Sequence, residues 1–397
     1  MHRARLPLLA LLALGAACGD DTEAQGQQAQ TCAVTLAPSD DDQTNVQTAF
    51  IQAAAGSMIC FADGTYRFTD ELSLTVPGIT LRGVGDAVIF DFAEQQAGGN
   101  GLNVTGDDFT VENLTIKNSP GDGIRVSDAD GVTFRNLRVS WDAGSVTENG
   151  AYAIYPLGCT NVLVEDCEVS GASDAGIYVG QSKQIVVRRN VVHGNVAGIE
   201  IENSDDAEVY ENHAFDNTGG ILVFNLPNLP AGMGARVLVR DNVVESNNRA
   251  NFAPAGNIVA LVPAGTGVMV LAADETEIRD NTIENNVSAG VLVLSYQTVE
   301  LMGDPGAEDP SFDKYSSHTW IRGNAFTENG KDPKGPLAAF VTSADVVWDA
   351  WADADAGPAL CVQNEGASFR NLKFGEAADK RLADLNCALE PLPSVSF

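Results

Sequence analysis

A segment of about 22 residues recurs along most of this chain, and each copy holds two short runs in which apolar and polar residues alternate. The first clear copy, FTVENLTIKNSPGDGIRVSDADG, begins at Phe109, and later copies begin at Val132, Val162, Ile185 and Ala207. No helical stretch separates the two runs, so both are predicted to be strands. We therefore expect an all-β fold, a single-stranded parallel β-helix in which each copy forms one coil.

Alignment of the copies places the same residue types at the same point of successive coils. One column becomes an asparagine ladder, because an amide can donate to the next amide across the spacing of about 4.8 Å between coils. A second column pairs a small residue with a β-branched one, as in Gly198-Ile199 and Gly220-Ile221. Both columns are predicted to be structural. The ladder residues are Asn190, Asn212, Asn242, Asn281 and Asn324.

The two ends of such a stack expose unpaired strand edges and need caps. The segment TNVQTAFIQAAA has helical character, so we expect a helical N-terminal cap over residues 44–78. The repeats predict the β-helix over 79–350. Residues 351–397 are predicted to form the last rung and a C-terminal cap that folds over the open edge.

The chain begins with the features of an export signal. Two arginines precede an apolar run that is shorter than the roughly 20 residues of a membrane-spanning helix, so residues 1–17 are predicted to be a signal peptide. The segment GAAC resembles a bacterial lipobox, in which Cys18 becomes the lipidated first residue of a protein anchored at the cell envelope, in the periplasm or at the outer membrane or cell surface. The alternative is an ordinary signal peptide followed by a chance cysteine. Residues 18–43 are predicted to be a flexible tether.

The chain is strongly acidic, with 54 Asp and Glu residues against 23 Lys and Arg and a formal net charge of −31. Such a charge repels nucleic acids and anionic lipid headgroups, so we expect no nucleic-acid partner and membrane contact only through the lipid anchor. It also disfavours a polyanionic sugar unless a divalent cation bridges the two. Calcium is therefore the one candidate cofactor.

Six further cysteines in an exported chain predict disulfide bonds. Cys159 and Cys167 flank a strand that spans about 16 Å, whereas bonded cysteines have Cα atoms within about 7 Å, so these two are expected to be buried and free. The expected pairs staple the two caps: Cys32 with Cys60, and Cys361 with Cys387.

The outward positions of the first strand in each coil form a stripe rich in arginine. Paired hydrogen bonds from arginine would suit an acidic polysaccharide lying along the axis, with Arg188, Tyr210 and Arg240 as candidate contacts. The alternative is that these arginines pair with acids of neighbouring coils. The stripe runs through Glu112, Arg135, Glu165, Arg188, Tyr210, Arg240, Arg279 and Arg322.

The outward positions of the second strand place tyrosines beside carboxylates. We predict that Tyr155 and Tyr178 are exposed and stack on sugar rings. Glu200 and Glu202 point the same way about 6.6 Å apart along the strand, near the low end of the spacing for an inverting catalytic pair. Solvated strand residues or cation ligands are the alternatives for these two glutamates.

Four other side chains are weaker candidates. Asp122 and Asp174 lie at matching turns and are candidate metal ligands. His193 and His213 are predicted to face outward on neighbouring coils, and His213 joins the two glutamates as a candidate catalytic residue. The sequence has no HExxH, CxxC, phosphate-loop or GxSxG motif, so redox and acyl-transfer chemistry are not expected.

Long insertions interrupt the coils, and in repeat proteins these collect around the binding surface. The most distinctive is NNRANFAPAGNIVALVPAGTG, which is either a ligand-binding loop or a packed loop that shields a coil. The insertions cover residues 142–151, 225–235, 248–266, 295–318 and 330–336.

The repeats, the cap and the phrases GIYVGQS, VAGIEIENS and NTGGILVFNLPNLP resemble the bacterial exported parallel β-helix repeat family of unassigned function, within the pectin-lyase-like superfamily. The resemblance covers roughly residues 50–390. It implies a right-handed coil and an exported or lipidated protein, often encoded beside a cytochrome-like exported protein. The superfamily contains polysaccharide lyases, hydrolases and mannuronan epimerases, although their DPHD, GHG and WIDH motifs are absent from this sequence.

Two hypotheses about function follow. The first is a lipid-anchored β-helix that binds polysaccharide and, in its stronger form, processes it as a lyase, hydrolase or epimerase. The second is a non-catalytic scaffold that docks an exported partner protein such as the cytochrome-like neighbour. An exposed apolar strip of Leu222, Met269 and Leu292 would favour the second.

Overall fold

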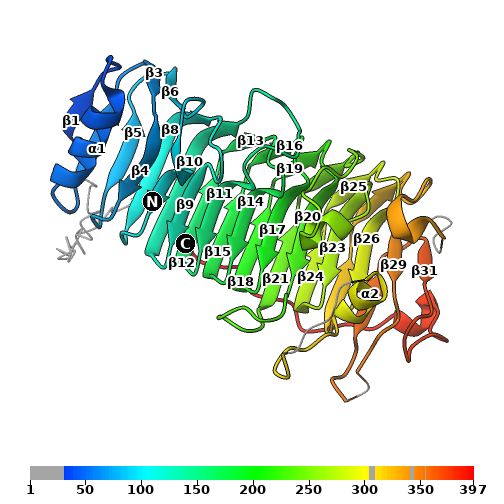
Figure 1. Cartoon of the computed structure of the whole chain (residues 1–397). Helices are drawn as coiled ribbons and strands as arrows, with labels where there is room; N and C mark the ends of the chain where they lie inside the picture. Colours follow the sequence, from blue (N-terminus) through cyan, green and yellow to red (C-terminus); the bar gives the residue numbers. More distant parts are fainter. Residues whose placement is uncertain (1–30, 304–308, 340–343, 354) are drawn as a thin grey trace, which may run out of the picture. The chain divides into compact units, whose positions relative to one another are not determined.

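The computed structural model describes residues 31–303, 309–339, 344–353 and 355–397. The predicted signal peptide and Cys18 lie outside the described residues. Residues from Cys32 onward form one right-handed parallel β-helix, as the repeats predict (Figure 1). No helix in the described ranges is both long and apolar enough to cross a membrane.

The strands of the β-helix form two parallel sheets, named A and B here. A typical coil consists of a strand of sheet A, a short second strand of sheet A and a strand of sheet B. Sheet B consists of β4 (Asp70–Leu74), β7 (Ala97–Val104), β9 (Ile124–Ser127), β11 (Tyr152–Leu157), β14 (Ala175–Gly180), β17 (Ala197–Glu202), β20 (Gly219–Phe224), β23 (Thr266–Leu271), β26 (Ala289–Leu294), β29 (Val346–Trp348) and β31 (Phe369–Asn371).

Sheet A begins with β1 (Cys32–Leu36), β2 (Met58–Phe61), β3 (Gly64–Arg67), β5 (Thr80–Gly83), β6 (Val88–Asp91), β8 (Phe109–Lys117) and β10 (Asp130–Ser140). The regular coils then contribute β12 (Thr160–Glu165), β13 (Glu168–Ser170), β15 (Lys183–Arg188), β16 (Val191–His193), β18 (Asp205–Tyr210), β19 (His213–Phe215), β21 (Ala235–Arg240) and β22 (Val243–Glu245). Its last strands are β24 (Asp274–Arg279), β25 (Thr282–Glu284), β27 (Thr319–Arg322), β28 (Ala325–Thr327) and β30 (Leu360–Gln363).

The helices are short and lie outside the sheets. They are α1 (Asp42–Gln52), α2 (Tyr296–Leu301) and the 3₁₀ helices η1 (Ile258–Leu261), η2 (Gly335–Ala339) and η3 (Leu382–Leu385).

The predicted asparagine ladder is present, and each amide donates to the side-chain oxygen of the next coil. The bonds from Asn190 to Asn212 and from Asn212 to Asn242 are both 3.0 Å long. Each amide also donates to a backbone carbonyl, as Asn212 does to Val187 at 2.9 Å, so the buried turn keeps its polar groups paired. The ladder continues one coil further than predicted, to Asn364.

A second ladder, which the sequence analysis did not identify, follows five residues after the first. It joins Asn195, Asn217, Asn247, Asn286 and Asn329 by amide bonds of 2.9–3.2 Å. The sequence could have predicted this ladder, because a second asparagine follows the first by five residues in each of these copies. Two ladders, one at each end of the short strand, hold the corners of the coil.

The N-terminal cap begins earlier than predicted. β1 pairs with β2 in parallel, so residues 32–36 belong to the sheet and not to the tether. The expected disulfide between Cys32 and Cys60 is present, with Cα atoms 5.7 Å apart. The predicted cap region 44–78 contains most of α1 but also the first strands of the coil, because apolar side chains such as Phe61 already fill its interior.

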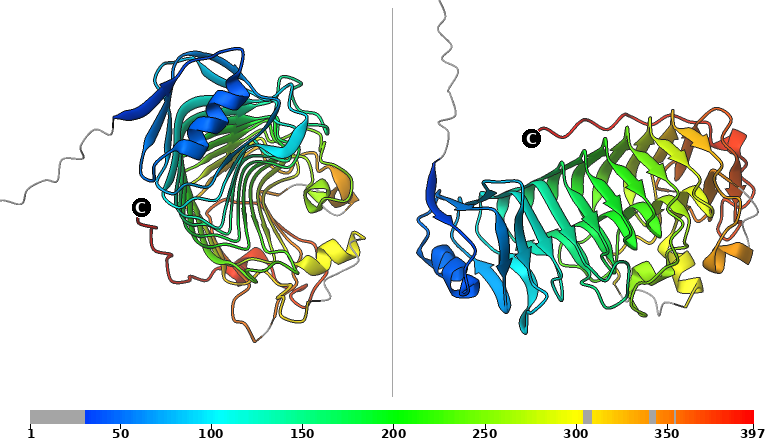
Figure 2. Two further views of the ribbon diagram at one scale, coloured as in Figure 1. Left: turned by 60° about the vertical axis from the view of Figure 1, so that its left-hand side comes forward. Right: turned by 90° about the horizontal axis from the view of Figure 1, so that it is seen from above.

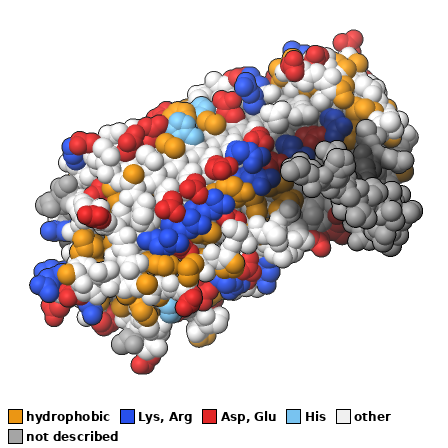
Figure 3. All heavy atoms as spheres, turned by 180° about the vertical axis from the view of Figure 1, so that it is seen from behind, with side chains coloured by type: hydrophobic (Ala, Val, Ile, Leu, Met, Phe, Trp, Pro, Cys, Tyr) orange, Lys and Arg blue, Asp and Glu red, His pale blue; other side chains and the backbone are white. Residues whose placement is uncertain are grey.

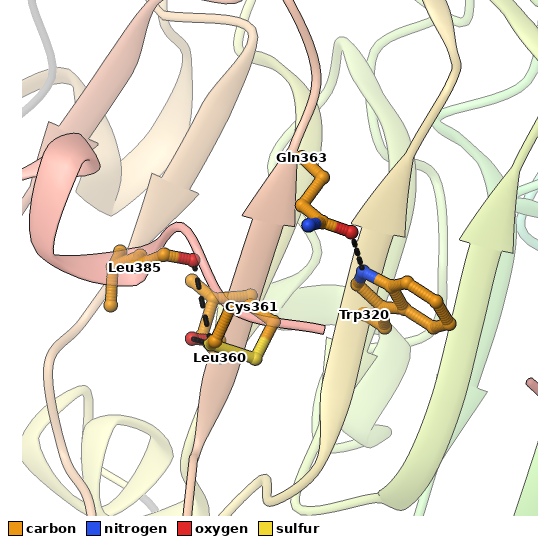
Figure 4. The surroundings of a disulfide bond; sticks show 6 residues. Trp320, Leu360, Cys361, Gln363 and Leu385 are labelled. Atoms are coloured by element: carbon orange, nitrogen blue, oxygen red, sulfur yellow. Dashed lines mark hydrogen bonds between the residues drawn. A yellow bond between two sulfur atoms is a disulfide. The ribbon is translucent and has the colours of Figure 1, made fainter. Parts of the chain in front are cut away.

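The C-terminal cap contains the second expected disulfide, between Cys361 and Cys387, with Cα atoms 5.1 Å apart (Figure 4). The last residues do not fold over the open edge. They run back along sheet A (Figures 1 and 2), where the amide of Leu392 donates to Glu277 at 2.8 Å and that of Val395 to Glu208 at 2.9 Å. These buried carboxylates supply acceptors that hold the tail in place.

Two apolar clusters stabilise the molecule. One fills the inside of the coils, and the buried, free Cys159 and Cys167 belong to it, as expected. The other lies on the outer side of sheet B, where side chains of the strands pack against Val259, Val262 and Tyr296 from two of the insertions. The insertions are gathered along one side of the coil (Figure 2). This second cluster covers the surface on which the sequence analysis placed its main candidates.

Candidate functional site

The outward residues of β11, β14 and β17 bring the predicted tyrosines and glutamates together. Parallel pairing aligns Tyr178 with Glu200, and Glu200 with Leu222 of β20. Because side chains alternate along a strand, Glu202 points to the same side as Glu200. The predicted column is therefore correct.

The predicted exposure of this column is wrong. Tyr178 is 4% exposed and Glu200 only 1%. Leu222, Met269 and Leu292, predicted to form an exposed strip, are 0%, 3% and 0% exposed. The physical reason is that residues 248–266, 295–303 and 309–318 contribute side chains that pack on sheet B and exclude water from it. This outcome agrees with the packed-loop interpretation of NNRANFAPAGNIVALVPAGTG.

Glu200 and Glu202 form a carboxyl pair. Their side chains are hydrogen-bonded to each other, which requires a proton on one of them. Burial and the negative charges of Asp174 and Glu202 raise the pKa of Glu200 well above its usual value. Burial also raises the pKa of Glu202, against hydrogen bonds from Tyr178 and Glu200. Contact with Glu202 raises the pKa of Glu200, whereas contact with Glu200 lowers that of Glu202, so the shared proton is assigned to Glu200 and Glu202 is the acceptor.

The contact between the two carboxyls argues against an inverting pair. Two carboxyls in direct hydrogen-bonding contact leave no place between them for a sugar and a water molecule, which need about 6.5–9.5 Å. The pair resembles instead two acids that share one proton and can donate and accept at a single point.

Tyr178 is the third member of this group, and its ring lies along its own strand over Gly180. Its hydroxyl donates to Oε1 of Glu202 at 2.5 Å. A side chain at Gly180 would collide with the ring, since an added Cβ would lie 2.3 Å from Cε1 of Tyr178. Burial and the charge of Glu202 raise the pKa of Tyr178, so its hydroxyl keeps its proton.

Asp174 lies beside this pair, at the turn before β14. Its Oδ2 accepts a hydrogen bond of 3.3 Å from the amide of Asn257, on one of the covering insertions, and Tyr152 also bonds to this carboxyl. Burial and the charge of Glu202 raise the pKa of Asp174 to about 7. Two buried oxygens, Oδ1 of Asp174 and Oε2 of Glu200, have no N–H or O–H donor other than the proton that the glutamates share.

The accessible edge of the cluster is formed by half-buried side chains of β9 and β11. The rings of Tyr152, Tyr155 and Tyr178 pack together with centroids 4.5–4.9 Å apart. Arg125 lies over the ring of Tyr155, at 5.1 Å. Burial raises the pKa of Asp122 to about 6, although the charge of Arg125 opposes the shift.

The sequence analysis missed two members of this cluster, Tyr152 and Asn257. Tyr152 lies three residues before Tyr155, so regular alternation along β11 would place it on the other side, yet the two rings pack with centroids 4.5 Å apart. Asn257 reaches Asp174 across 83 residues of sequence, and no local pattern predicts such a contact.

Asp122 and Asp174 were predicted as metal ligands. Among the described residues, no group of three or more His, Cys, Asp or Glu side chains is arranged to hold a metal ion. The two aspartates are close enough to influence each other's charge, and Asp122 contributes to the raised pKa of Asp174.

The arginine stripe of sheet A is present, and most of its arginines bind acids of neighbouring coils, as the structural alternative predicts, whereas Arg279 pairs with Glu277 and Asp280 of its own coil. Arg188 lies 2.7 Å from Glu165 and donates to the hydroxyl of Tyr210, while Arg240 lies 2.6 Å from Glu208 and 4.0 Å from the ring centroid of Tyr210. Figure 3 shows basic and acidic side chains interleaved on the face opposite to that of Figure 1. A role in binding for Arg188, Tyr210 and Arg240 remains a prediction.

The histidines are not part of the carboxyl cluster. His213 lies on β19 in sheet A and contacts Glu245 at 2.8 Å. Its register partner is Val191, so His213 and His193 do not form one column, although each packs on Phe215. The structure does not bring His213 to Glu200 and Glu202, because they belong to different sheets.

Comparison with known proteins supports the architecture. The sequence model of the protein family described as the right-handed β-helix region matches residues 144–304 of this chain. No curated protein matches the chain. Among solved structures, the chain is similar to the A-modules of two mannuronan C-5 epimerases of Azotobacter vinelandii, AlgE4 and AlgE6.

These two similarities extend over most of each chain. For AlgE4 the TM-score is 0.50 with 15% identity, covering 83% of this chain and 92% of that one. For AlgE6 the TM-score is 0.53 with 17% identity, covering 84% and 91%. At such identities the likeness concerns the fold alone. With its two parallel sheets, repeated coils and asparagine ladders, the chain has the fold of the right-handed parallel β-helix proteins.

Proposed function

We propose that this chain is an exported protein that binds polysaccharide at the half-buried edge of the outer side of sheet B, beside Tyr152 and Tyr155, and transfers protons to or from the bound sugar. The observation that carries the proposal is the shared-proton pair of Glu200 and Glu202 under two insertions, beside half-buried tyrosines. The fold likeness to two mannuronan epimerase modules is compatible with this function.

The chemistry of the pair favours one type of reaction. A protonated carboxyl beside an ionised one can act as acid and base at a single sugar atom. In this proposal Glu200 donates, Glu202 accepts and Tyr178 holds Glu202 in place. Such a pair does not suit inverting hydrolysis, which needs separated carboxyls.

Export is supported by the two disulfides, since these bonds persist in oxidising compartments. Lipid attachment at Cys18 is a further part of the proposal. Replacing Cys18 with serine should release the protein from the membrane fraction into the soluble fraction. An unchanged distribution would contradict the anchor without affecting the binding proposal.

The alternative of a scaffold for a partner protein rested on an exposed apolar strip. Leu222, Met269 and Leu292 are covered by the chain's own insertions, so this observation no longer favours it. We therefore propose no second function.

The test is a binding screen of the purified protein against uronate, neutral and amino glycans, with and without calcium. Saturable binding is expected, and Glu202→Gln should weaken it about 10-fold, because a charge-assisted hydrogen bond is lost. Glu200→Gln should abolish any turnover. Glu94→Gln, which removes the charge of an exposed acid elsewhere, is the matched control. Absence of binding to every glycan would overturn the proposal.

A further inference from the structure

We infer that the carboxyl–tyrosine cluster recognises a positively charged, amine-bearing sugar and not a uronate or a neutral sugar. This inference rests on the proposed function and names the class of its ligand. The cluster consists of Asp174, Glu200 and Glu202 with the rings of Tyr152 and Tyr178.

The first argument is that this cluster lacks basic partners. Among the described residues, the cation within electrostatic reach is Arg125, which acts on Asp122 and Tyr155. No Lys or Arg is among the main causes of the pKa shifts of Asp174, Glu200 and Glu202. Buried carboxyls without a counter-charge retain protons instead, and a ligand that brings a positive charge can replace those protons.

The second argument is the contrast with sheet A of the same protein. Its buried acids each have arginine partners, so the chain neutralises acids that only support the coil. The pairs include Glu112 with Arg135, Glu165 with Arg188, Glu208 with Arg240 and Glu277 with Arg322. The acids of sheet B depart from this pattern.

The third argument is that two carboxyl oxygens in the cluster are unsatisfied hydrogen-bond acceptors. Asp174 is 5% exposed and Glu200 is 1% exposed. Neither Oδ1 of Asp174 nor Oε2 of Glu200 accepts a hydrogen bond from an N–H or O–H group, apart from the proton that the two glutamates share. An ammonium group carries three donors and a positive charge, whereas a sugar hydroxyl carries one donor and a uronate adds repulsion. The carboxyls are not arranged as a metal site, which favours an organic cation.

The fourth argument concerns access. The amide of Asn257 contacts Oδ2 of Asp174 at 3.3 Å, near the long limit for a hydrogen bond. Asn257 itself is exposed, so this contact lies at the edge of the covering insertion. An ammonium group entering beside Tyr152 would replace the Asn257 amide, while the tyrosine rings contact the sugar face and the cation.

The experiment compares ligands that differ only in the amine. The full chain is titrated by calorimetry in 0.15 M salt with a glucosamine tetramer and with its N-acetylated counterpart, and also with oligogalacturonate and cellotetraose. We expect one glucosamine tetramer per chain, bound at least about 10-fold more tightly than each of the other three. Asp174→Asn should weaken binding of the glucosamine tetramer about 10-fold and so remove its preference over the other three oligosaccharides. Glu94→Gln should leave the preference unchanged.

The outcomes separate this inference from the function on which it rests. Preferred binding of the uronate or neutral oligosaccharide would overturn the inference and leave the proposed function standing. Equal loss in Asp174→Asn and Glu94→Gln would show non-specific attraction to an acidic surface and overturn the inference. No binding of any oligosaccharide would overturn both. Thermal unfolding confirms that Asp174→Asn is folded, and Asn257→Ala gives a second test, because it should keep or strengthen glucosamine binding.

Discussion

The hydroxyl of Tyr178 donates a 2.5 Å hydrogen bond to Glu202, which lies on the next coil. The ring reaches this position because it lies over Gly180, whose own register partner is Glu202. One glycine thus allows an aromatic side chain to contact an acid that the strand pairing alone would not bring to it. The carboxyl pair depends on this contact for its orientation.

Gly180→Ala should disturb that contact. The added methyl would lie 2.3 Å from Cε1 and 2.5 Å from the hydroxyl oxygen of Tyr178, so the ring must shift. We expect a loss of about 1–3 kcal/mol in the free energy of unfolding, measured with urea, because overpacking forces neighbours from their preferred positions. Gly99→Ala is the control, since a methyl added there would meet no atom within 4 Å. Equal stability of the two variants would contradict the packing argument.

Glu165→Gln should destabilise sheet A. Burial raises the pKa of Glu165, but hydrogen bonds from Arg135, Arg188 and Arg189 outweigh it and lower the pKa to about 2. Removal of this charge leaves three guanidinium groups without their shared acceptor, which should cost about 2–3 kcal/mol in urea unfolding. Glu168→Gln, whose exposed partner Arg138 is 3.3 Å away, should cost under about 0.5 kcal/mol. A similar cost for both would contradict the importance of burial.

Stability should fall as the pH rises from 5 to 8. Burial raises the pKa of Asp349 from 3.8 to about 7, despite hydrogen bonds from Ser295 and Thr298. A carboxyl that holds its proton more tightly when folded stabilises the folded state at low pH. This contribution is lost as the pH rises through the folded pKa.

The variant Asp349→Asn isolates this effect from the general repulsion of an acidic chain. Its unfolding free energy should vary with pH by about 2–4 kcal/mol less than that of the unmodified protein between pH 5 and 8. The measurement is urea unfolding at four pH values. An identical slope in both proteins would contradict the assignment to Asp349.

Asn212→Ala should weaken the middle of the β-helix. The change leaves the backbone and side-chain amides of Asn190 and the carbonyl of Val187 without their partners. Unsatisfied buried groups should cost about 2–4 kcal/mol, measured by thermal or urea unfolding. Asn103→Ala, which removes one half-buried bond to Glu71, is the control and should cost about 1 kcal/mol or less. A neutral Asn212→Ala would show that water replaces the ladder.

The sequence alone predicted the coil, the register and the disulfides. These features depend on side chains that repeat at one period, because identical positions stack when parallel strands pair. The columns through Tyr178 and Glu200, and through Arg135 and Glu165, can therefore be aligned from the repeats alone. The second asparagine ladder obeys the same rule and could have been found in the same way.

Only the tertiary structure decided which outward residues face water. Alternation along a strand separates inside from outside, but it does not show that an insertion from another coil will cover the outside. Asn257 meets Asp174 across 83 residues, and Val395 meets Glu208 across 187. Such contacts have no period, so repetition cannot predict them. They turned a predicted exposed platform into a buried carboxyl pair, because covering loops remove water and so raise the pKa of the acids beneath them.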